Sequence, residues 1–408
     1  MLFKREITNK TEERDYRLSV GCVLYYLMSV LNATVKTILP DSGIVSILSL
    51  LTGAVILLGF LQCLPAALRR NKIKLFFSYA LFIGIYAVSY GLITLRGEPT
   101  DVMLSGSAFL TFAWWIPLGV FACSVYDKRV LYEVFLKASY FILLLLTLMF
   151  LYHPLSENGV AAYNMFFGFN MLLPTLFHIN ELFKRKKFIF FLLVFIEFMM
   201  ILIYANRGCL LPIAFIVIYK LIFENRKRAT TLLPLILVVV VAIALMWEQI
   251  MGGLASFLEG FGLSSRTLWY IMSGELTEGS GRDEIWKHSI EMINERPILG
   301  WGLGGEFYHL AAFDSVTSVD NSFTPHNGVL QNLVNLGVFF GTIATIIIVR
   351  PYFRLRRIKD AYYHDLVLIF GSAIVAIFYS ASGFFTNPMV ALFLYLAYSY
   401  KKTSIQRT

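Results

Sequence analysis

Apolar stretches long enough to cross a membrane recur along the whole chain. A transmembrane helix needs about 20 apolar residues to cross about 30 Å of hydrocarbon. Twelve stretches reach or approach this length, at roughly 18–39, 43–64, 74–94, 103–126, 130–152, 160–180, 188–204, 207–223, 230–247, 328–349, 363–381 and 385–400. We therefore expect an all-α integral membrane protein with about twelve transmembrane helices.

Composition agrees with this expectation. The chain is 58% hydrophobic and 15% charged, and its mean hydropathy is +0.68. A soluble domain usually has about 45–50% apolar and about 25% charged residues. The polar residues 1–17 lack the apolar core of a secretory signal. All four cysteines lie in or at the ends of apolar stretches, so we expect no disulfide framework.

Basic residues concentrate on one side of the predicted transmembrane helices. If both termini are cytoplasmic, the cytoplasmic segments hold 26 of the 35 Lys and Arg residues. This bias follows the positive-inside rule. It also explains the net charge of +9 without nucleic acid as a partner. We expect a multi-pass protein of the bacterial cytoplasmic membrane with both termini in the cytoplasm.

A hairpin is predicted between the basic runs KRKK (184–187) and ENRKR (224–228). Both flanks should be cytoplasmic, so the 36 mostly apolar residues between them must cross the membrane twice. Each arm has about 18 residues and is about 27 Å long. The turn falls near Arg207, at the outer edge of the hydrocarbon. Arg207 either anchors the turn by snorkelling or faces an anionic substrate group, and its position leaves both readings open.

One long hydrophilic loop is predicted, at 248–325, on the external side. It separates an N-terminal transmembrane part (1–247) from a C-terminal one (326–408). Ser280–Asp283 has the spacing of a capping box and predicts a helix that ends at Pro297. Trp286, Ile290 and Ile293 would share one face of that helix. The glycine-rich run that follows, 298–305, has no βαβ context, so a dinucleotide site is not indicated.

Several polar residues have both a structural and a functional reading. His326 stands just before the apolar run at 328 and either caps that helix or acts in chemistry, with Asn327 also able to cap. Arg282 is either a surface charge in the first turn of the loop helix or a substrate contact. We see no His-x₃-His pair, Cys/His cluster or Asp-x-Asp, so we expect no metal and no cofactor. Glu197 is expected to be paired internally.

The chain resembles the bacterial O-antigen polymerase and O-antigen ligase family of polytopic glycosyltransferases, most strongly over about 200–341. The motifs that carry the resemblance are Ala205-Asn206-Arg207-Gly208, Gly281-Arg282-Asp283-Glu284-Ile285-Trp286, Pro297-Ile298-Leu299-Gly300-Trp301-Gly302-Leu303-Gly304 and Pro325-His326-Asn327, with Gly337 eleven residues after the histidine. Two positions depart from the family pattern. Asn206 stands where Ser is more usual, and Phe340 stands where a small residue is usual.

The resemblance implies a helical bundle similar to GT-C glycosyltransferases and transfer of a lipid-linked oligosaccharide on the outer membrane face. The donor would be an undecaprenyl diphosphate-linked glycan, and the acceptor a second such lipid. Expected partners also include the bilayer and the chain-length regulator and flippase of the same pathway. Arg207 and Arg282 would stabilise the diphosphate leaving group, since guanidinium suits phosphate oxygens. His326 would be the general base of a metal-independent, inverting transfer.

The remaining assignments are secondary. We expect further substrate contacts from Asn327, Arg266, Trp301, Gly302 and Gly304, and we name Asp320, Glu306 and Asp41 as reserve bases. Two other functions stay open. The first is an O-antigen ligase, which transfers the glycan to a lipid A core. The second is a lipid-linked oligosaccharide flippase, which would line a central path with charges, whereas the unusual residues here gather at the outer face.

Overall fold

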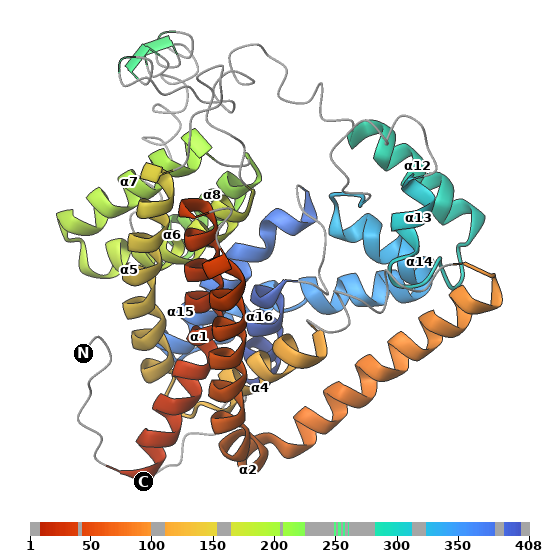
Figure 1. The fold of residues 1–408 in the computed structure, drawn as a ribbon, viewed down its shortest axis with the longest axis horizontal. Coiled ribbons are helices and arrows are strands. Elements are labelled where there is room, and N and C mark those ends of the chain that lie inside the picture. The colour runs from red at the N-terminus through yellow and green to blue at the C-terminus, as the bar shows by residue number, and fades with distance from the viewer. Residues whose placement is uncertain are drawn as a thin grey trace. The chain divides into compact units, whose positions relative to one another are not determined.

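The structure is a computed structural model of the chain, shown as a ribbon in Figure 1. It describes residues 9–39, 43–98, 111–152, 165–204, 207–224, 249, 252–253, 256–257, 260, 282–311, 324–379 and 387–400. Every regular element in these ranges is helical, as the apolar stretches predict. The elements that position the site are α1 (Lys10–Ile38), α2 (Gly43–Leu95), α4 (Ile116–Ser124), α5 (Lys128–Tyr152), α6 (Met165–Arg185), α7 (Phe188–Tyr204), η3 (Arg207–Cys209), α8 (Leu210–Tyr219), η4 (Lys220–Glu224), α12 (Arg282–Glu295), α13 (Gly305–Ala311), α14 (Gly328–Val349), η5 (Tyr352–Arg357), α15 (Ala361–Ala373), η6 (Ile374–Phe378) and α16 (Pro388–Ser399).

The chain forms two compact units, each assembled from segments that are far apart in sequence. The first unit comprises Met1–Leu24, Ile56–Val134 and Ser280–Thr408, and the second comprises Tyr25–Val55 and Phe135–Gly279. The division into 1–247, 248–325 and 326–408 concerns membrane topology and stays a prediction. The first unit contains α12, α13 and α14, and the second contains the predicted hairpin.

Five helices among the described residues are long and apolar enough to cross a membrane. They lie within Lys10–Ile38, Val45–Leu95, Lys128–Tyr152, Gly328–Arg357 and Ala361–Phe378. Shorter apolar helices also occur, and the bounds of α7 and α14 coincide with the predicted stretches 188–204 and 328–349. The predicted stretch 230–247 lies outside the described residues. The structure therefore supports a multi-pass helical protein, while the number twelve stays a prediction.

Helix α2 contains two of the predicted spans. Its 53 residues would extend about 80 Å as a straight helix, far more than the hydrocarbon thickness. Asn71 has non-helical dihedrals (φ −142°, ψ 38°), and the helix turns sharply there (Figure 1). The Asn71 side chain donates a hydrogen bond to Ser124 Oγ at 2.8 Å, and Arg70 pairs with the buried carboxylate of Asp15. The basic segment 65–74, which separates the predicted stretches 43–64 and 74–94, is therefore a helix with one break.

In the second unit, a helix break falls at the predicted hairpin turn. Helix α7 ends at Tyr204, and the short η3 begins at Arg207 and leads into α8. The buried Glu197 of α7 accepts from or donates to His178 of α6, with Oε1 and Nδ1 2.6 Å apart. Glu197 is thus paired internally, as predicted. Lys220 is also buried, and it pairs with Glu224 at 2.7 Å.

Candidate functional site

Helix α12 lies in the first unit and presents its apolar side to α13 and α14. It begins at Arg282, within the predicted capping box, and ends at Glu295, before Pro297 as predicted. Its buried residues are Ile285, Ser289 and Met292. Ile285 and Met292 belong to a cluster with Trp301, Leu310 and Val334. Of the predicted face, Ile293 packs against this cluster, whereas Ile290 is 50% exposed.

The turn before α14 is held from two sides. Trp286 of α12 donates a hydrogen bond from its indole Nε1 to the carbonyl oxygen of Pro325 at 2.8 Å. Asn327 caps α14, because its Oδ1 accepts from the amides of Val329 at 3.0 Å and Leu330 at 3.2 Å. The sequence allowed either His326 or Asn327 to cap this helix, and in the structure Asn327 is the cap. The cap also explains why the polar residue stands directly before the apolar run.

His326 lies between these two anchors in a strained conformation. Its φ is +49°, in the left-handed region that non-glycine residues rarely adopt. Such strain, on the order of 1–3 kcal/mol, persists only where the surroundings fix it, and it is concentrated at functional sites. Here the surroundings are the Trp286 hydrogen bond on one side and the Asn327 cap on the other.

The electrostatic environment keeps the His326 imidazole neutral. Burial lowers the pKa of His326, and the positive charge of Arg282 lowers it further, to about 4. At neutral pH the ring is therefore unprotonated and able to accept a proton. The same interaction places Arg282, at the start of α12, close enough to His326 to influence its titration. The structure thus brings together two of the three residues predicted to be catalytic.

Helix α14 is broken at Gly337, where φ is +74° and ψ is 174°. The break leaves backbone groups without their usual partners inside the helix. The glycine-rich turn supplies those partners: Trp301 N donates to Val334 O at 2.8 Å, and Gly302 N donates to Asn335 O at 2.9 Å. In return, Val338 N donates to Pro297 O at 2.7 Å. The turn and the broken helix are joined backbone to backbone.

Glycine is required at both sides of this junction. A Cβ atom on Gly300 would lie 2.5 Å from Gly337 N, and a Cβ atom on Gly337 would lie 2.3 Å from the carbonyl oxygen of Ile298. Both distances are far below any normal contact, and the opposing atoms are backbone that cannot rotate away. The glycine-rich motif therefore serves the packing of α14.

Trp301 and its neighbours are integrated into the same packing. Trp301 is 5% exposed, and its indole Nε1 donates to Met292 O at 2.9 Å. The Arg296 guanidinium lies 3.8 Å from the centroid of its ring, and Arg96 donates to the carbonyl oxygens of Gly300 and Trp301. The hydrogen bonds and ring contacts just described explain how the turn packs, but they do not test substrate binding. Substrate contacts by Trp301, Gly302 and Gly304 therefore stay a prediction.

Glu306, a reserve base, is buried at the start of α13. Its Oε1 accepts a hydrogen bond from Gln331 Nε2 of α14 at 2.7 Å. Burial raises the pKa of Glu306, although interactions with Gln331 and Asn335 partly offset this. The carboxyl group therefore holds its proton more firmly than an exposed glutamate does, and it joins α13 to α14 through Gln331. Its role as a reserve base stays a prediction.

The other predicted site residues are placed less fully. The backbone of Arg207 opens η3 in the second unit. Asp41, Arg266 and Asp320 lie outside the described residues. Their assignments, and the diphosphate role of Arg207, stay predictions.

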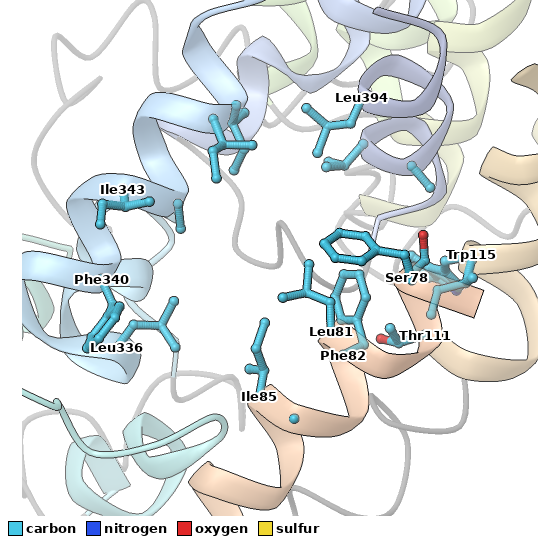
Figure 2. A pocket seen from close by; sticks show the side chains of 18 of the residues that line it. Ser78, Leu81, Phe82, Ile85, Thr111, Trp115, Leu336, Phe340, Ile343 and Leu394 are labelled. Carbon is cyan, nitrogen blue, oxygen red and sulfur yellow. The ribbon is translucent and has the colours of Figure 1, made fainter. Parts of the chain in front are cut away.

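An apolar cavity of about 930 Å³ lies within the first unit. Figure 2 shows Leu81 and Ile85 of α2 facing Leu336, Phe340 and Ile343 of α14 across it, with Leu394 of α16 on a third side. Sequence reasoning missed this cavity, because its walls come from segments that are far apart in sequence, such as residues 74–92 of α2 and 336–348 of α14. Polar lining residues occur near its ends, where Asn335 and Lys74 are found.

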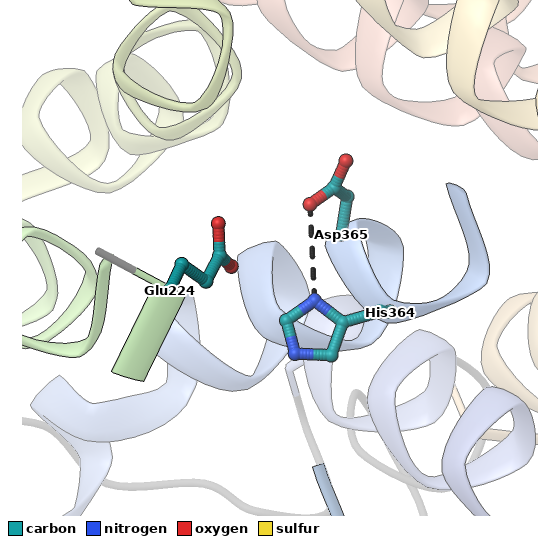
Figure 3. Close-up of side chains that lie close together, drawn as sticks. All are labelled: Glu224, His364 and Asp365. Atoms are coloured by element: carbon teal, nitrogen blue, oxygen red, sulfur yellow. Dashed lines mark ion pairs between the residues drawn. The ribbon is translucent and has the colours of Figure 1, made fainter. Parts of the chain in front are cut away.

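A histidine and a carboxylate, both residue types that bind metals, lie close together at the start of α15. His364 Nδ1 lies 3.8 Å from the Asp365 carboxylate at the start of α15 (Figure 3). Glu224, also drawn there, belongs to the second unit and pairs with Lys220 at 2.7 Å. A histidine and a carboxylate are ligands that divalent transition metals accept, but two ligands alone do not define a site.

The central part of the chain matches a known protein family. Residues 188–346 match the family model described as O-antigen ligase. This part of the chain is similar to the O-antigen ligase family. The match covers η3 with Arg207, α12 with Arg282 and the turn with His326, and it confirms the resemblance seen in the sequence. No curated protein matches the chain.

Proposed function

We propose that the chain is a membrane glycosyltransferase that polymerises undecaprenyl diphosphate-linked repeat units into surface polysaccharide. The reaction would take place on the outer face of the bacterial cytoplasmic membrane, with both termini inside. The observation that carries this proposal is the neutral His326, held beside Arg282 at the start of α14, within the segment that matches the O-antigen ligase family.

The proposed reaction is a single displacement. The acceptor sugar hydroxyl gives its proton to His326, and its oxygen forms a bond to the anomeric carbon of the donor glycan. The bond from that carbon to the diphosphate oxygen breaks, and the lipid diphosphate leaves with the electron pair. Attack opposite the leaving group inverts the anomeric configuration. Arg282 stabilises the charge that develops on the diphosphate, and charge-assisted contacts of this kind contribute several kcal/mol in a water-poor site.

The coupling between Arg282 and His326 gives the base a substrate-dependent strength. Arg282 helps to hold the His326 pKa near 4 in the substrate-free protein. A diphosphate beside Arg282 adds negative charge and raises that pKa again. The imidazole would therefore become a stronger base once the donor is in place, which limits unproductive protonation beforehand.

The apolar cavity suits the lipid part of the donor. It runs along α2 and α14, and Asn335, which lines it, follows His326 by about 13 Å of helix rise. A polyprenyl chain in this cavity would leave its head group on the side of the glycine-rich turn, represented in the lining by Leu299. We propose that the donor binds in this orientation.

Substitution of His326 tests the proposal directly. Asn tolerates positive φ better than most residues, so His326→Asn should retain the turn while removing the base. Purified protein in liposomes, given undecaprenyl diphosphate-linked repeat units, should form longer glycans, and His326→Asn should reduce the rate by about 10²-fold or more. His288→Asn on α12, where His288 is half-buried and pairs with Glu291, is the control. Wild-type rates in His326→Asn would contradict the assignment.

Metal independence is a separate part of the proposal. We propose that Arg282 and Arg207 supply the positive charge that a divalent ion supplies in other diphosphate-dependent transferases. EDTA should leave glycan extension unchanged. Loss of activity with EDTA and its recovery with a divalent ion would refute this part, and Arg207→Lys tests the contribution of the second unit.

The ligase is the second candidate, favoured by the description of the family that matches. It differs only in the acceptor, so the same liposomes with lipid A core would give a lipid A-linked glycan. A flippase would instead move the lipid-linked glycan across the bilayer without making a bond. The chain-length regulator and flippase of the pathway are proposed partners.

A further inference from the structure

Lys74 lies at one end of the apolar cavity. Of the described residues that line the cavity, it is the one that carries a charge. Its Nζ donates a hydrogen bond to Ser399 Oγ at 2.8 Å and lies 4.0 Å from Cys123 Sγ. Within the described ranges these two neutral groups are its polar partners, and no carboxylate forms an ion pair with it.

The surroundings of Lys74 add positive charge. Lys128 is close enough to Lys74 for their charges to interact, and its own Nζ donates to the carbonyl oxygen of Ala122 at 3.0 Å. Asp15, an acid whose charge acts on Lys128, is engaged by Arg70 and by the amides of Tyr126 and Asp127. A cation that faces an apolar cavity with hydroxyl and thiol partners lacks local charge compensation.

The length of the cavity places this cation at a membrane boundary. The lining residues of α2 run from Lys74 to Leu92, a rise of about 27 Å, close to the hydrocarbon thickness of a bilayer. Leu92 is at the end near the glycine-rich turn, since the neighbouring Ile93 lies against Gly302. Lys74 is therefore at the opposite boundary from the His326 turn.

We propose that the Lys74 end of the cavity binds the anionic headgroup of a membrane phospholipid, whose acyl chain lies against Leu81 and the facing residues of α14. An apolar channel with a cation at its mouth matches an amphiphile with a negative headgroup. A free anion would have no contact with the apolar walls. The proposal concerns a ligand other than the glycan donor, and its test needs no glycosyltransferase activity, although the acyl chain would share the apolar walls with the polyprenyl chain of the donor.

Lipid binding to the purified full-length protein tests this inference without any glycan donor. Native mass spectrometry would compare phosphatidylglycerol with phosphatidylcholine of the same acyl chains. We expect the wild type to prefer phosphatidylglycerol about fivefold, the effect of one Lys near the membrane surface. Lys74→Gln should remove this preference. Lys72→Gln is the matched control, since Lys72 is exposed, precedes Lys74 by two residues and does not line the cavity.

Three outcomes would overturn the proposal. Equal losses in Lys74→Gln and Lys72→Gln would indicate a general surface charge effect. Displacement of phosphatidylglycerol by inorganic phosphate would indicate a site for a soluble anion. Leu81→Trp, which fills the cavity and leaves the charge intact, should weaken binding of both lipids, so unchanged binding in this variant would exclude the cavity. Leu81→Trp also keeps the test decisive if Lys74→Gln does not fold.

Discussion

The indole Nε1 of Trp286 lies 2.8 Å from the carbonyl oxygen of Pro325 and donates a hydrogen bond to it. Trp286 follows Arg282 by about one helical turn, and Pro325 precedes His326 directly. One bond therefore links the helix that carries the cation to the turn that carries the base. Its strength decides how well the two groups keep their separation.

Removal of this bond should affect turnover more than folding. Trp286→Phe retains an aromatic ring but loses the donor, and one hydrogen bond contributes about 0.5–1.5 kcal/mol to stability. We expect glycan extension to slow about tenfold or more, since small displacements of reacting groups are costly. Tyr352→Phe is the control, because it loses a 2.6 Å bond to the carbonyl oxygen of Gly371 on another helix. Equal rates in the two variants would contradict a positioning role for Trp286.

The pH dependence of catalysis should report the coupling between His326 and Arg282. The base must be neutral, so kcat/KM should fall only as pH drops to about 4, the pKa in the free protein. The donor diphosphate raises this pKa, so the acid limb of kcat should lie at higher pH than that of kcat/KM. Arg282→Gln removes a charge that lowers the pKa, and it should move the kcat/KM limb upward.

His288→Gln is the control for that experiment. His288 lies on the same helix as Arg282 but pairs with Glu291 at 2.9 Å. Its loss should leave both acid limbs in place. If Arg282→Gln also leaves the kcat/KM limb unmoved, the electrostatic coupling is wrong.

Gly337→Ala should destabilise the protein strongly. The added Cβ would lie 2.3 Å from the Ile298 carbonyl oxygen, and the positive φ alone costs about 1–2 kcal/mol for a residue with a side chain. Gly91→Ala on α2 is the control: nothing lies within 4 Å of its Cβ, and Ala favours a helix over Gly by about 1 kcal/mol. Thermal unfolding in detergent should show a lower Tm for Gly337→Ala and an equal or higher Tm for Gly91→Ala. Similar Tm values for the two variants would show that the break is not required.

Glu306→Gln should change how stability depends on pH. Burial raises the pKa of Glu306 in the folded protein above the usual 4.5, so the folded state holds this proton more firmly than the unfolded state. The resulting stability is fully present below about 4.5 and is lost as pH rises through the folded pKa. Gln cannot lose a proton, so the Tm difference between Glu306→Gln and the wild type should grow with pH. Parallel Tm curves would mean that the pKa of Glu306 is the same in the folded and unfolded protein.

The sequence predicted those parts of the fold that depend on local composition. Apolar length located α7 and α14, and the lone acid Glu197 within an apolar stretch was correctly expected to be paired internally. The apolar face of α12 was predicted in part, because Ile293 packs against the cluster but the most buried residues lie on a neighbouring stripe that α13 and α14 cover. Ile290 therefore stands exposed while Met292 is buried.

The candidate site was also predicted only in part. His326 and Arg282 were found from residue type and motif order, and the structure brings them close to each other. The contact between Trp286 and Pro325 was not predicted, since it joins residues 39 apart and has no local signal. The break of α14 was also not predicted, because a glycine within an apolar run is common in membrane helices.

The contact between Gly300 and Gly337 has a consequence for how such sequences diverge. When a side chain clashes with a neighbouring side chain, a smaller neighbour can relieve the clash, but here each glycine opposes backbone. Neither position therefore has a second substitution that would rescue a change at the first. Apart from the cluster residues of α13 and α14 and the turn of His326 and Asn327, the chain between them can lengthen, shorten or change composition. As related proteins adapt to different sugars, variation is expected to accumulate between these two fixed points.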